Sequence, residues 1–592
     1  MKALLPIVLA LMATAHPALA HTIYVDAANT SGIEDGTDEH PFNTIREGIA
    51  SASVGDTVMA RAGIYYPDES WNDHHNLLLM KAGVTLRGEG RDATILEGKV
   101  VDTQQSNLPI VVEDLAFDEF HFWRGPQEGP FDQQNIVRRC GGGVIGIGHA
   151  GGVGEEDPPP VHRVLIEDND LGTEGIIQFG QGSGTANDTV RNNVCGYILI
   201  LSGYGYTYLV DNNDVQYGIK DASGASITTT ICNNMIHNGP IIDQSGSKEY
   251  EDQIWENNII NCNENAPLLI AEGITSAVYA YAGSATLRNN IITCTGNVSG
   301  IRASSGAPFH VIDNTITVDE VMMPSSDPEE GIVGLWNYSG WGFVTGNTIS
   351  GGDAGYYSAA GTAEFANNTV TRSCTGFYSC GAEEVHHNTI TECSGDGMVL
   401  HGLRGPIHHN TIRDNGGAGI RVEFPRIDLG GGEFDCPGNN IIMGNGNYDL
   451  LIEAISGQYP VLFAKYNIWD HADSAEIATY DIYDGSDAEG LLLVDFMPFD
   501  ILGIGDLPLP GDVLQLFPIP ATTTLRLQPP AGLRMPAMME LFNLDGARVA
   551  RETIPPFADT VTLEVGHLPS GVYICRLQDD NHTWPKRVVI AQ

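Results

Sequence analysis

The chain has 592 residues and a formal net charge of −46, from 29 basic and 75 acidic side chains. Such a charge repels nucleic acid and anionic lipid, so the sequence argues against nucleic-acid partners. The chain has 70 glycines, well above ordinary usage, while 42% of its residues are hydrophobic, and this composition is typical of a folded chain with many tight turns rather than a disordered one.

Residues 1–20, MKALLPIVLALMATAHPALA, have the pattern of a cleaved secretory signal peptide. A lone Lys2 precedes an apolar stretch, and the segment ends in the small-x-small sequence Ala18-Leu19-Ala20. We therefore expect the mature chain to begin near His21. No later stretch reaches the length of about eighteen apolar residues that a membrane-spanning helix needs, so we expect no membrane span after signal removal.

A short helix is predicted near the start of the mature chain, because Thr44-Ile45-Arg46-Glu47 has the form of a capping box. Beyond it, a phrase of the form apolar-x-x-Asn-x-(Ile/Val) recurs mostly every 20 to 24 residues. A period of this size indicates a solenoid. The repeated asparagines are Asn169, Asn193, Asn213, Asn234, Asn258, Asn290, Asn314, Asn347, Asn368, Asn388, Asn410 and Asn440.

Each repeat is predicted to contain strands rather than helices. Segments such as LRNNIITC and FANNTVTR are short, β-branched and interrupted by Asn. About ten residues after most of the asparagines, a Gly begins a second apolar run, as in GFYSC from residue 376 and GIRVE from residue 419. We therefore predict at least two strands per coil, with coils stacked in parallel about 4.8 Å apart.

In these features, residues 22 to 500 resemble the right-handed parallel β-helix of the pectin-lyase-like superfamily. The opening TIYVDAANTSG and the segment 466–499, which begins YNIWDHADS, are similar to the first and last coils of such proteins. The predicted fold class is all-β, a right-handed parallel β-helix followed by a small antiparallel β-sandwich. The predicted domains are a signal peptide (1–20), an N-terminal cap with the first coils (21–100), β-helix repeats (101–500), a linker (501–513) and a C-terminal domain (514–592).

The resemblance implies that the repeated asparagines stack at a turn. Asn suits this position because it tolerates left-handed backbone and offers both a donor and an acceptor.

The last eighty or so residues resemble the type A C-terminal sorting domain of type IX secretion. The matching positions are Pro518, Pro520, Gly546, Leu568, Gly571, Tyr573 and the closing 586–589, KRVV. Ile519 departs from the pattern, because the family usually has Asn there. The resemblance implies an interaction with the type IX secretion machinery, removal of the tail, and a protein that is secreted or held at the outer-membrane surface of a Gram-negative bacterium. The alternative is an ordinary carbohydrate-binding or adhesive module.

The sequence leaves two interpretations of the cysteines open. Cys262 and Cys294 each follow a repeated asparagine by four positions on consecutive coils, where Cα atoms about one rung apart could form a disulfide. The same positions suit a ladder of reduced, small apolar side chains.

Two histidine pairs stand out in VHHNTI (385–390) and IHHNTI (407–412). The repeat register makes Asn388 and Asn410 the constant element, and it predicts that His386 and His408 face solvent about one rung apart. This pair, with His401 nearby, could bind a transition metal. Because no carboxylate or thiolate is aligned with it, the sequence assigns no metal site.

The resemblance also implies where polysaccharide chemistry would occur, on side chains that project outward from one sheet. In the family, lyases use Lys or Arg as a base with a cation such as Ca²⁺, and hydrolases use aspartates. If the residue after each Gly points inward, the next points outward. The substrate-binding residues predicted in this way are Tyr357, Tyr378, Arg421 and His401, and the candidate catalytic residues are Lys220 or Arg302 for a lyase and Asp221 and Glu423 for a hydrolase.

Two functions are therefore carried forward. The first is an exported or cell-surface protein without catalysis, which binds a polysaccharide or cell-surface glycan or serves as an adhesin or stalk, because no catalytic constellation stands out. The alternative is a secreted polysaccharide lyase or glycoside hydrolase acting on acidic polysaccharide. No cofactor is assigned, although Asp481, Asp484 and Asp487 could hold a Ca²⁺.

Overall fold

The computed structural model divides into two compact units, residues 1–500 and 501–592, and the predicted signal peptide and linker lie outside the residues that it describes, apart from Ala20. The described residues are 20–66, 77–102, 108–124, 134–149, 163–180, 187–201, 207–222, 228–244, 253–281, 284–304, 308–319, 331–338, 341–360, 364–381, 384–402, 404–424, 426–455, 460–500, 515–517, 521, 523–528, 537–543, 548–554, 561–569, 571–578 and 583–590.

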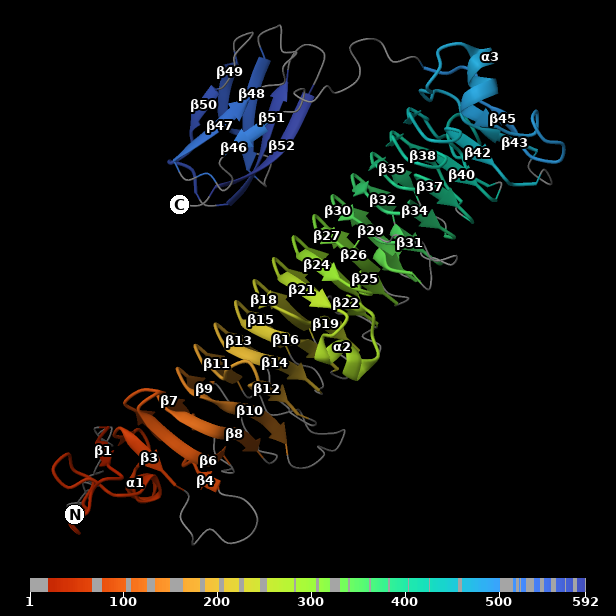
Figure 1. Cartoon of the computed structure of the whole chain (residues 1–592). Helices are drawn as coiled ribbons and strands as arrows, with labels where there is room; N and C mark the ends of the chain where they lie inside the picture. The colour runs from red at the N-terminus through yellow and green to blue at the C-terminus, as the bar shows by residue number, and fades with distance from the viewer. Residues whose placement is uncertain are drawn as a thin grey trace, which may run out of the picture. The chain divides into compact units, whose positions relative to one another are not determined.

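The first unit is a parallel β-helix whose coils stack in chain order (Figure 1). One face is a 16-stranded parallel sheet, which we call sheet A. Its strands in spatial order are β1 (Thr22–Val25), β2 (Thr57–Ala60), β5 (Thr85–Gly88), β7 (Val111–Glu113), β9 (Gln134–Arg138), β11 (Arg163–Glu167), β13 (Asp188–Arg191), β15 (Thr207–Asp211), β17 (Thr228–Cys232), β20 (Gln253–Glu256), β23 (Ala285–Arg288), β26 (Pro308–Ile312), β29 (Trp341–Thr345), β32 (Glu364–Ala366), β35 (Val385–His386) and β38 (Ile407–His408).

Two further ladders of parallel strands complete the coils. The inner-turn ladder follows the repeated asparagines and contains β18 (Met235–Ile236), β21 (Ile259–Asn263), β24 (Ile291–Thr295), β27 (Thr315–Thr317), β30 (Thr348–Ser350), β33 (Thr369–Thr371), β36 (Thr389–Thr391), β39 (Thr411–Arg413) and β41 (Ile441–Met443). The ridge ladder contains β12 (Ile176–Phe179), β19 (Ile241–Asp243), β22 (Ser276–Ala280), β25 (Ser299–Ala303), β28 (Val333–Asn337), β31 (Ala354–Ser358), β34 (Thr375–Ser379), β37 (Met398–Leu400), β40 (Ile420–Val422), β42 (Leu450–Ile452) and β44 (Ile482–Tyr483).

Near the N-terminus some strands belong to both ladders. These are β6 (Thr94–Asp102), β8 (Ala116–Arg124), β10 (Gly141–His149), β14 (Val194–Ile200) and β16 (Asp214–Asp221). The strand β3 (Gly63–Tyr65) pairs with the first part of β6, and β4 (Leu77–Leu79) pairs with its second part. The last coil adds the pair β43 (Val461–Phe463) and β45 (Leu493–Asp495), the short helix α3 (Ser474–Glu476) and a π-helical turn at Ile477–Asp481.

The predicted helix is present as α1 (Ile45–Ser51), at the N-terminal end of the stack (Figure 1). The Thr44 side chain accepts a hydrogen bond from the Glu47 backbone N–H, and the Thr44 hydroxyl donates to the Glu47 carboxylate at 2.7 Å. Ile45 and Ile49 are buried in the same core as Ile23 of β1. The predicted helix and its N-cap at Thr44 are therefore confirmed, and the helix packs on the core of the first coil.

The repeated asparagines form a buried hydrogen-bonded ladder. At Asn290, Oδ1 accepts from the backbone N–H and the Nδ2 of Asn258, at 3.0 and 2.9 Å, while its own Nδ2 donates to the Trp255 carbonyl and to Oδ1 of Asn314. The same pattern runs from Asn169 to Asn467, one coil beyond the last predicted member. Since each buried amide has partners in the adjacent coils, the ladder locks the register between them.

The left-handed backbone belongs to the residue before each ladder asparagine, not to the asparagine itself as expected. Asn289, Asp313, His387 and His409 all have φ between 55° and 56°. This position favours Asn and Asp because their short side chains tolerate the conformation. The ladder asparagine is selected instead for its two-sided hydrogen bonding.

The regular recurrence of a glycine at the start of the ridge strands has a packing cause. Gly376 precedes the buried Phe377 of β34, and a Cβ on Gly376 would lie 2.3 Å from Cγ2 of Ile390 and 2.6 Å from the carbonyl oxygen of Gly397. Gly355 and Gly397 show the same close approach in the neighbouring coils. Only a residue without a side chain lets the ridge ladder lie so close to the inner-turn ladder.

The cysteine pair Cys262 and Cys294 stands in register between β21 and β24, and both residues are free, buried thiols. Burial raises the pKa of Cys262 to about 12. Of the two interpretations, Cys262 and Cys294 therefore fit reduced thiols that pack as small apolar side chains, and not a disulfide.

The second unit is a small antiparallel β-fold, as predicted. One sheet contains β46 (Gln515–Phe517), β47 (Thr524–Gln528) and β50 (Val561–Glu564), and the other contains β49 (Arg548–Ile554), β48 (Ala537–Asn543), β51 (Gly571–Gln578) and β52 (Thr583–Ile590). Leu525, Leu541, Leu577 and Ile590 belong to one shared core.

Candidate functional site

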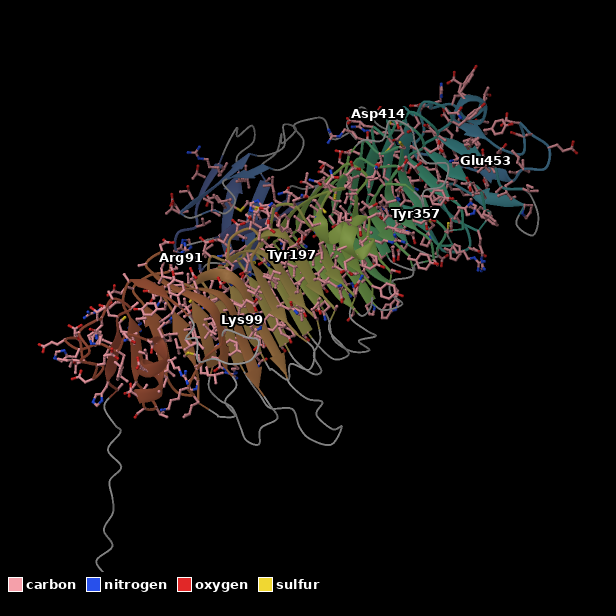
Figure 2. All side chains as sticks on the ribbon, turned by 60° about the horizontal axis from the view of Figure 1, so that its bottom comes forward. Arg91, Lys99, Tyr197, Tyr357, Asp414 and Glu453 are labelled. Atoms are coloured by element: carbon pink, nitrogen blue, oxygen red, sulfur yellow. The ribbon has the colours of Figure 1, made fainter. Side chains whose placement is uncertain are left out.

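The side chains predicted to face outward stand in one register row of the ridge ladder. Strand pairing links Lys220, Ile242, Tyr279, Arg302, Trp336, Tyr357, Tyr378, Val399 and Arg421 in that order. Tyr357 and Glu453 mark this face in Figure 2. Side chains alternate between the two faces of a strand, and this alternation correctly predicted which residues share the row.

Within this row the aromatic side chains differ in accessibility. Tyr357 is only 3% exposed and packs with Trp336, so its ring cannot stack on a sugar as expected. Its ring centroid lies 5.3 Å from that of Tyr378, which in turn lies 6.0 Å from that of His401. Phe424, 53% exposed, continues the series at 5.3 Å from His401. At this end of the ridge the accessible aromatic series is therefore Tyr378, His401 and Phe424.

Arg421 is surrounded by carboxylates. Its guanidinium lies 2.9 Å from Asp396, 3.8 Å from Glu423 and 3.9 Å from Glu453. Glu423 is also hydrogen-bonded to Nδ1 of His401. Arg421 thus neutralises its own neighbours, and the patch around it carries more negative than positive charge.

The predicted catalytic residues do not form one centre. Asp221 is 1% exposed and accepts a hydrogen bond from the Thr229 hydroxyl at 2.6 Å, so it points into the solenoid and cannot reach a substrate. Lys220 forms an ion pair at 2.7 Å with Glu272 of α2 (Pro267–Glu272). The guanidinium of Arg302 lies 3.4 Å from the centre of the Trp336 ring.

Glu423 lies on the strand of Arg421, eight pairing steps from Lys220, which at about 4.8 Å per step separates them by about 38 Å. Lys220 and Asp221 therefore cannot act on the same bond as Glu423.

A cavity that the sequence did not reveal lies on the outer face of sheet A. It has a volume of about 570 Å³ and is lined by His310, Trp341, Gly342, Phe343, Glu364, Glu384, Arg404, Gly405, Pro406 and Phe434. Trp341 and Phe343 are about half exposed, at 51% and 49%. We call this the Trp341 cavity. The signal in the sequence was Trp341-Gly342-Phe343, two aromatic residues at the outward positions of one strand.

Each of the two glutamates in the Trp341 cavity holds a histidine of the repeated doublets. Oε1 of Glu364 lies 3.0 Å from Nε2 of His386, and Oε1 of Glu384 lies 3.3 Å from Nε2 of His408. The glutamates stand two residues before the strand partner of each histidine, on the preceding coil. The sequence showed no carboxylate aligned with His386 and His408. The structure places one beside each of them, from a residue on the preceding coil that is offset by two positions along the strand.

The register of the histidines is confirmed. His386 pairs with His408, and their ring planes are parallel within 2° at a centroid distance of 5.1 Å. Their side chains are only 17% and 13% exposed, so they are more covered than expected. His387 and His409 stack in the same way at 4.7 Å and are exposed. Burial, with the nearby imidazoles, lowers the pKa of His387 and of His409.

The acidic residues of the last coil do not group as expected. Among the described residues, ligand atoms of Asp481 converge with those of Asp449 and Asp470 rather than with Asp484 and Asp487. The Asp484 carboxylate accepts from backbone N–H groups of Ser486 and Val494 and so fixes a turn. Burial raises the pKa of Asp449 to about 8.

Two family models match the chain. Residues 329–424 match the right handed beta helix region, and residues 515–591 match the secretion system C-terminal sorting domain. The chain matches no curated protein. None of the described helices has the length and hydropathy needed to cross a membrane.

Among solved structures, the chain is similar to the PL6 family alginate lyase AlyGC, at 11% identity over 81% of this chain and 84% of the other, with a TM-score of 0.25. It is also similar to the catalytic unit of the GH87 alpha-1,3-glucanase from Streptomyces thermodiastaticus, at 12% identity over 82% and 69% of the two chains, with a TM-score of 0.23. A third is the A-module of the Azotobacter vinelandii mannuronan C-5 epimerase AlgE4, at 13% identity over 81% and 96%, with a TM-score of 0.16.

At these values the three similarities carry no argument about substrate or mechanism. The stacked parallel coils and the two family models do identify the architecture and the route of export. The chain is a right-handed parallel β-helix protein that carries a type IX secretion C-terminal sorting domain.

Proposed function

We propose that this exported β-helix binds a neutral glycan at the Trp341 cavity. The observation that carries the proposal is the combination of half-exposed Trp341 and Phe343 with the carboxylates of Glu364 and Glu384 in one concavity. Sugar rings present apolar C–H faces that pack on aromatic rings, and their hydroxyl groups donate hydrogen bonds to carboxylates. The contacts of Glu364 and Glu384 with His386 and His408 orient these acceptors before a ligand arrives.

The charge of the cavity favours a neutral glycan over an acidic one. Glu364, Glu384 and Arg404 all line the cavity, so carboxylates outnumber cations among its lining residues. Arg421 on the ridge is likewise surrounded by Asp396, Glu423 and Glu453. A polyuronate would meet repulsion at both places, and the net charge of −46 adds to it over longer distances.

Tyr378, His401 and Phe424 form a second aromatic surface on the ridge ladder, which is a separate face of the coil. None of these three side chains lines the Trp341 cavity. We place the principal sugar contacts in the Trp341 cavity and retain Tyr378, His401 and Arg421 as weaker contacts.

The second candidate function is glycoside hydrolysis at the same cavity. Glu364 and Glu384 precede Phe365 and Val385, which are strand partners, so the two glutamates stand about one rung of 4.8 Å apart. Carboxyl groups about 5 Å apart are typical of retaining glycosidases. Both side chains rise from the same face of one sheet, whereas such enzymes place their carboxylates on either side of the scissile bond, and this favours binding over hydrolysis.

The sorting domain directs the protein to the cell surface or the exterior, where its partner is a cell-surface or environmental polysaccharide. We propose that the tail engages the type IX machinery and is removed at the outer membrane of a Gram-negative bacterium. The β-helix is then released or attached at the surface. Mass spectrometry of the extracellular and surface fractions would test this: a surface-located chain that retains residues 515–591 would contradict removal.

A glycan array would test the binding function, with the purified full chain probed against neutral and acidic polysaccharides. We expect Trp341→Ala to weaken binding to a neutral glycan by about thirtyfold, or about 2 kcal/mol, as expected for a central aromatic contact. Phe424→Ala is the matched control, since it removes a comparably exposed aromatic residue from the ridge. Equal losses in both variants, or a preference for polyuronates, would refute the assignment, and release of reducing ends would favour hydrolysis.

A further inference from the structure

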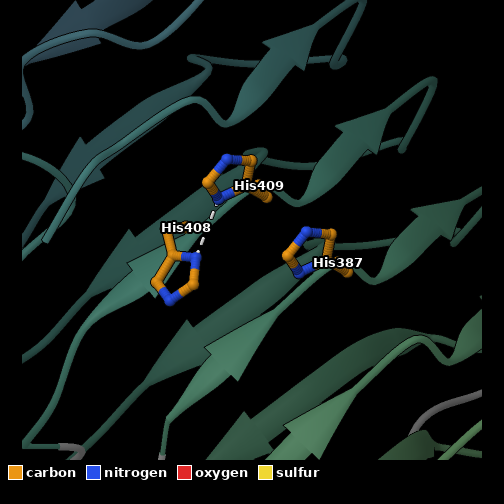
Figure 3. A group of neighbouring side chains, drawn as sticks. All are labelled: His387, His408 and His409. Carbon is orange, nitrogen blue, oxygen red and sulfur yellow. Dashed lines mark hydrogen bonds between the residues drawn. The ribbon is translucent and has the colours of Figure 1, made fainter. Parts of the chain in front are cut away.

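The doublets His386-His387 and His408-His409 bring several imidazoles together on two adjacent coils (Figure 3). Ring nitrogens of His387, His408 and His409 all lie within 4.8 Å of one another. This cluster lies where sheet A meets the turn that carries the asparagine ladder, next to the Trp341 cavity but built from different side chains. We propose that it binds one divalent transition-metal ion of the Cu²⁺ type.

The spacing within each doublet matches two ligands of one metal ion. Nδ1 of His408 and Nδ1 of His409 are hydrogen-bonded at 2.9 Å, as are those of His386 and His387, so a metal ion would take the place of the proton that one doublet shares. Two imidazole nitrogens bound about 2.0–2.1 Å from one metal at a right angle would be about 2.9 Å apart, whereas a tetrahedral angle would require about 3.3 Å. A right angle belongs to tetragonal coordination, which Cu²⁺ and Ni²⁺ prefer, and Cu²⁺ binds such nitrogen sites most tightly.

The Glu384 side chain orients one ligand. Its Oε1 lies 3.3 Å from Nε2 of His408, so the Nε2–H donates to the carboxylate and Nδ1 is left with a lone pair directed at the cluster. At His409 the Asn439 amide donates from Nδ2 to Nε2 of the ring at 3.2 Å, which places the ring proton on Nδ1. Rotation of the Asn439 amide by half a turn would present its oxygen to an Nε2–H and free Nδ1 of His409 for the metal.

The backbone holds the ligands in place without metal. His387 and His409 occupy the left-handed position, with φ of 56° and 55°, and their rings stack with planes 3° apart. Both are exposed, so a metal ion can enter from solvent. In a square plane a third nitrogen lies about 2.9 Å from one of the other two and about 4.1 Å from the other. Since the three nitrogens already lie within 4.8 Å of one another, His387 needs to move by no more than about 2 Å to join the other doublet.

Matched variants can remove the ligands without disturbing the coil. Asn occupies the equivalent left-handed position at Asn289, Asn367 and Asn439, so His387→Asn and His409→Asn substitute the residue that the fold already uses there. His237→Asn is the control, because His237 is an exposed histidine on a distant coil paired with Asp214. Circular dichroism spectra should be the same for all variants.

The test is titration of the full chain with Cu²⁺ in an excess of Mg²⁺, which occupies the surface carboxylates. We expect one tightly bound Cu²⁺, with nitrogen hyperfine splitting in its electron paramagnetic resonance spectrum. The double variant His387→Asn/His409→Asn should lose at least a hundredfold in affinity, Glu384→Gln about tenfold, and His237→Asn nothing. Absence of a tight site in the wild type, unchanged affinity in the double variant, or a spectrum from oxygen ligands alone would each overturn the proposal.

Discussion

Replacing a ladder asparagine in the middle of the stack should destabilise the solenoid strongly. Asn290 is 2% exposed, and its side chain joins three coils. In Asn290→Ala the buried N–H of Asn258 loses its acceptor. The side-chain bonds to Asn258, Asn314 and the Trp255 carbonyl are also lost. A stranded buried donor costs about 1–3 kcal/mol and each of the three further bonds about 0.5–1.5 kcal/mol, so the expected loss is about 2.5–7.5 kcal/mol.

The assay is urea denaturation followed by circular dichroism, combined with hydrogen exchange. The matched control is Asn297→Ala, which removes an exposed asparagine that contacts Glu264 and should change stability by less than about 0.5 kcal/mol. Because coils interact only with their neighbours, exchange should accelerate first in the strands beside Asn258 and Asn314. A loss below about 1 kcal/mol, or acceleration spread evenly along the stack, would refute the ladder's role in holding adjacent coils together.

Three further predictions follow from single contacts. Gly376→Ala forces a Cβ against Ile390 and should cost at least about 1–3 kcal/mol in the same denaturation assay, whereas tolerance without loss would contradict the close packing of the two ladders. The raised pKa of Asp449, about 8, means that the folded state binds its proton more tightly than the unfolded state. The stabilising contribution of this protonation, a few kcal/mol, is therefore present below about pH 4 and is lost as the pH rises towards 8. In Asp449→Asn the melting temperature should depend less on pH over this range. Thr44→Ala removes the cap of α1 and should lower the free energy of unfolding by about 1 kcal/mol. Glu47→Gln keeps the bond from the residue 47 backbone N–H to Thr44, so an equal loss of stability in that variant would argue against the cap.

The repeat and the strand alternation were sufficient to predict the coil. The spacing of the asparagines set the length of each coil, and a side-chain period of two then placed Lys220, Arg302, Tyr378 and Arg421 in one row. The same alternation sends Asp221 inward, so its rejection as a catalytic residue could have been predicted from the position of Lys220.

Contacts between coils could not be predicted in the same way, because they depend on which side chains of one coil lie over those of the next. Tyr357 and Tyr378 are equivalent in sequence, yet packing against Trp336 buries only Tyr357. The diagonal contact of Glu384 with His408 joins residues 24 positions apart.

The sequence by itself determined the β-helix, the capped N-terminal end, the asparagine ladder and the sorting tail, because each depends on local periodicity or a short motif. Only the tertiary structure decided that Trp341, Phe343 and two glutamates share a cavity, and that these glutamates contact His386 and His408. The physical reason is that loops of different length join the strands. How deep a surface cavity is, and which side chains are covered, therefore depends on the neighbouring coils and not on the repeat.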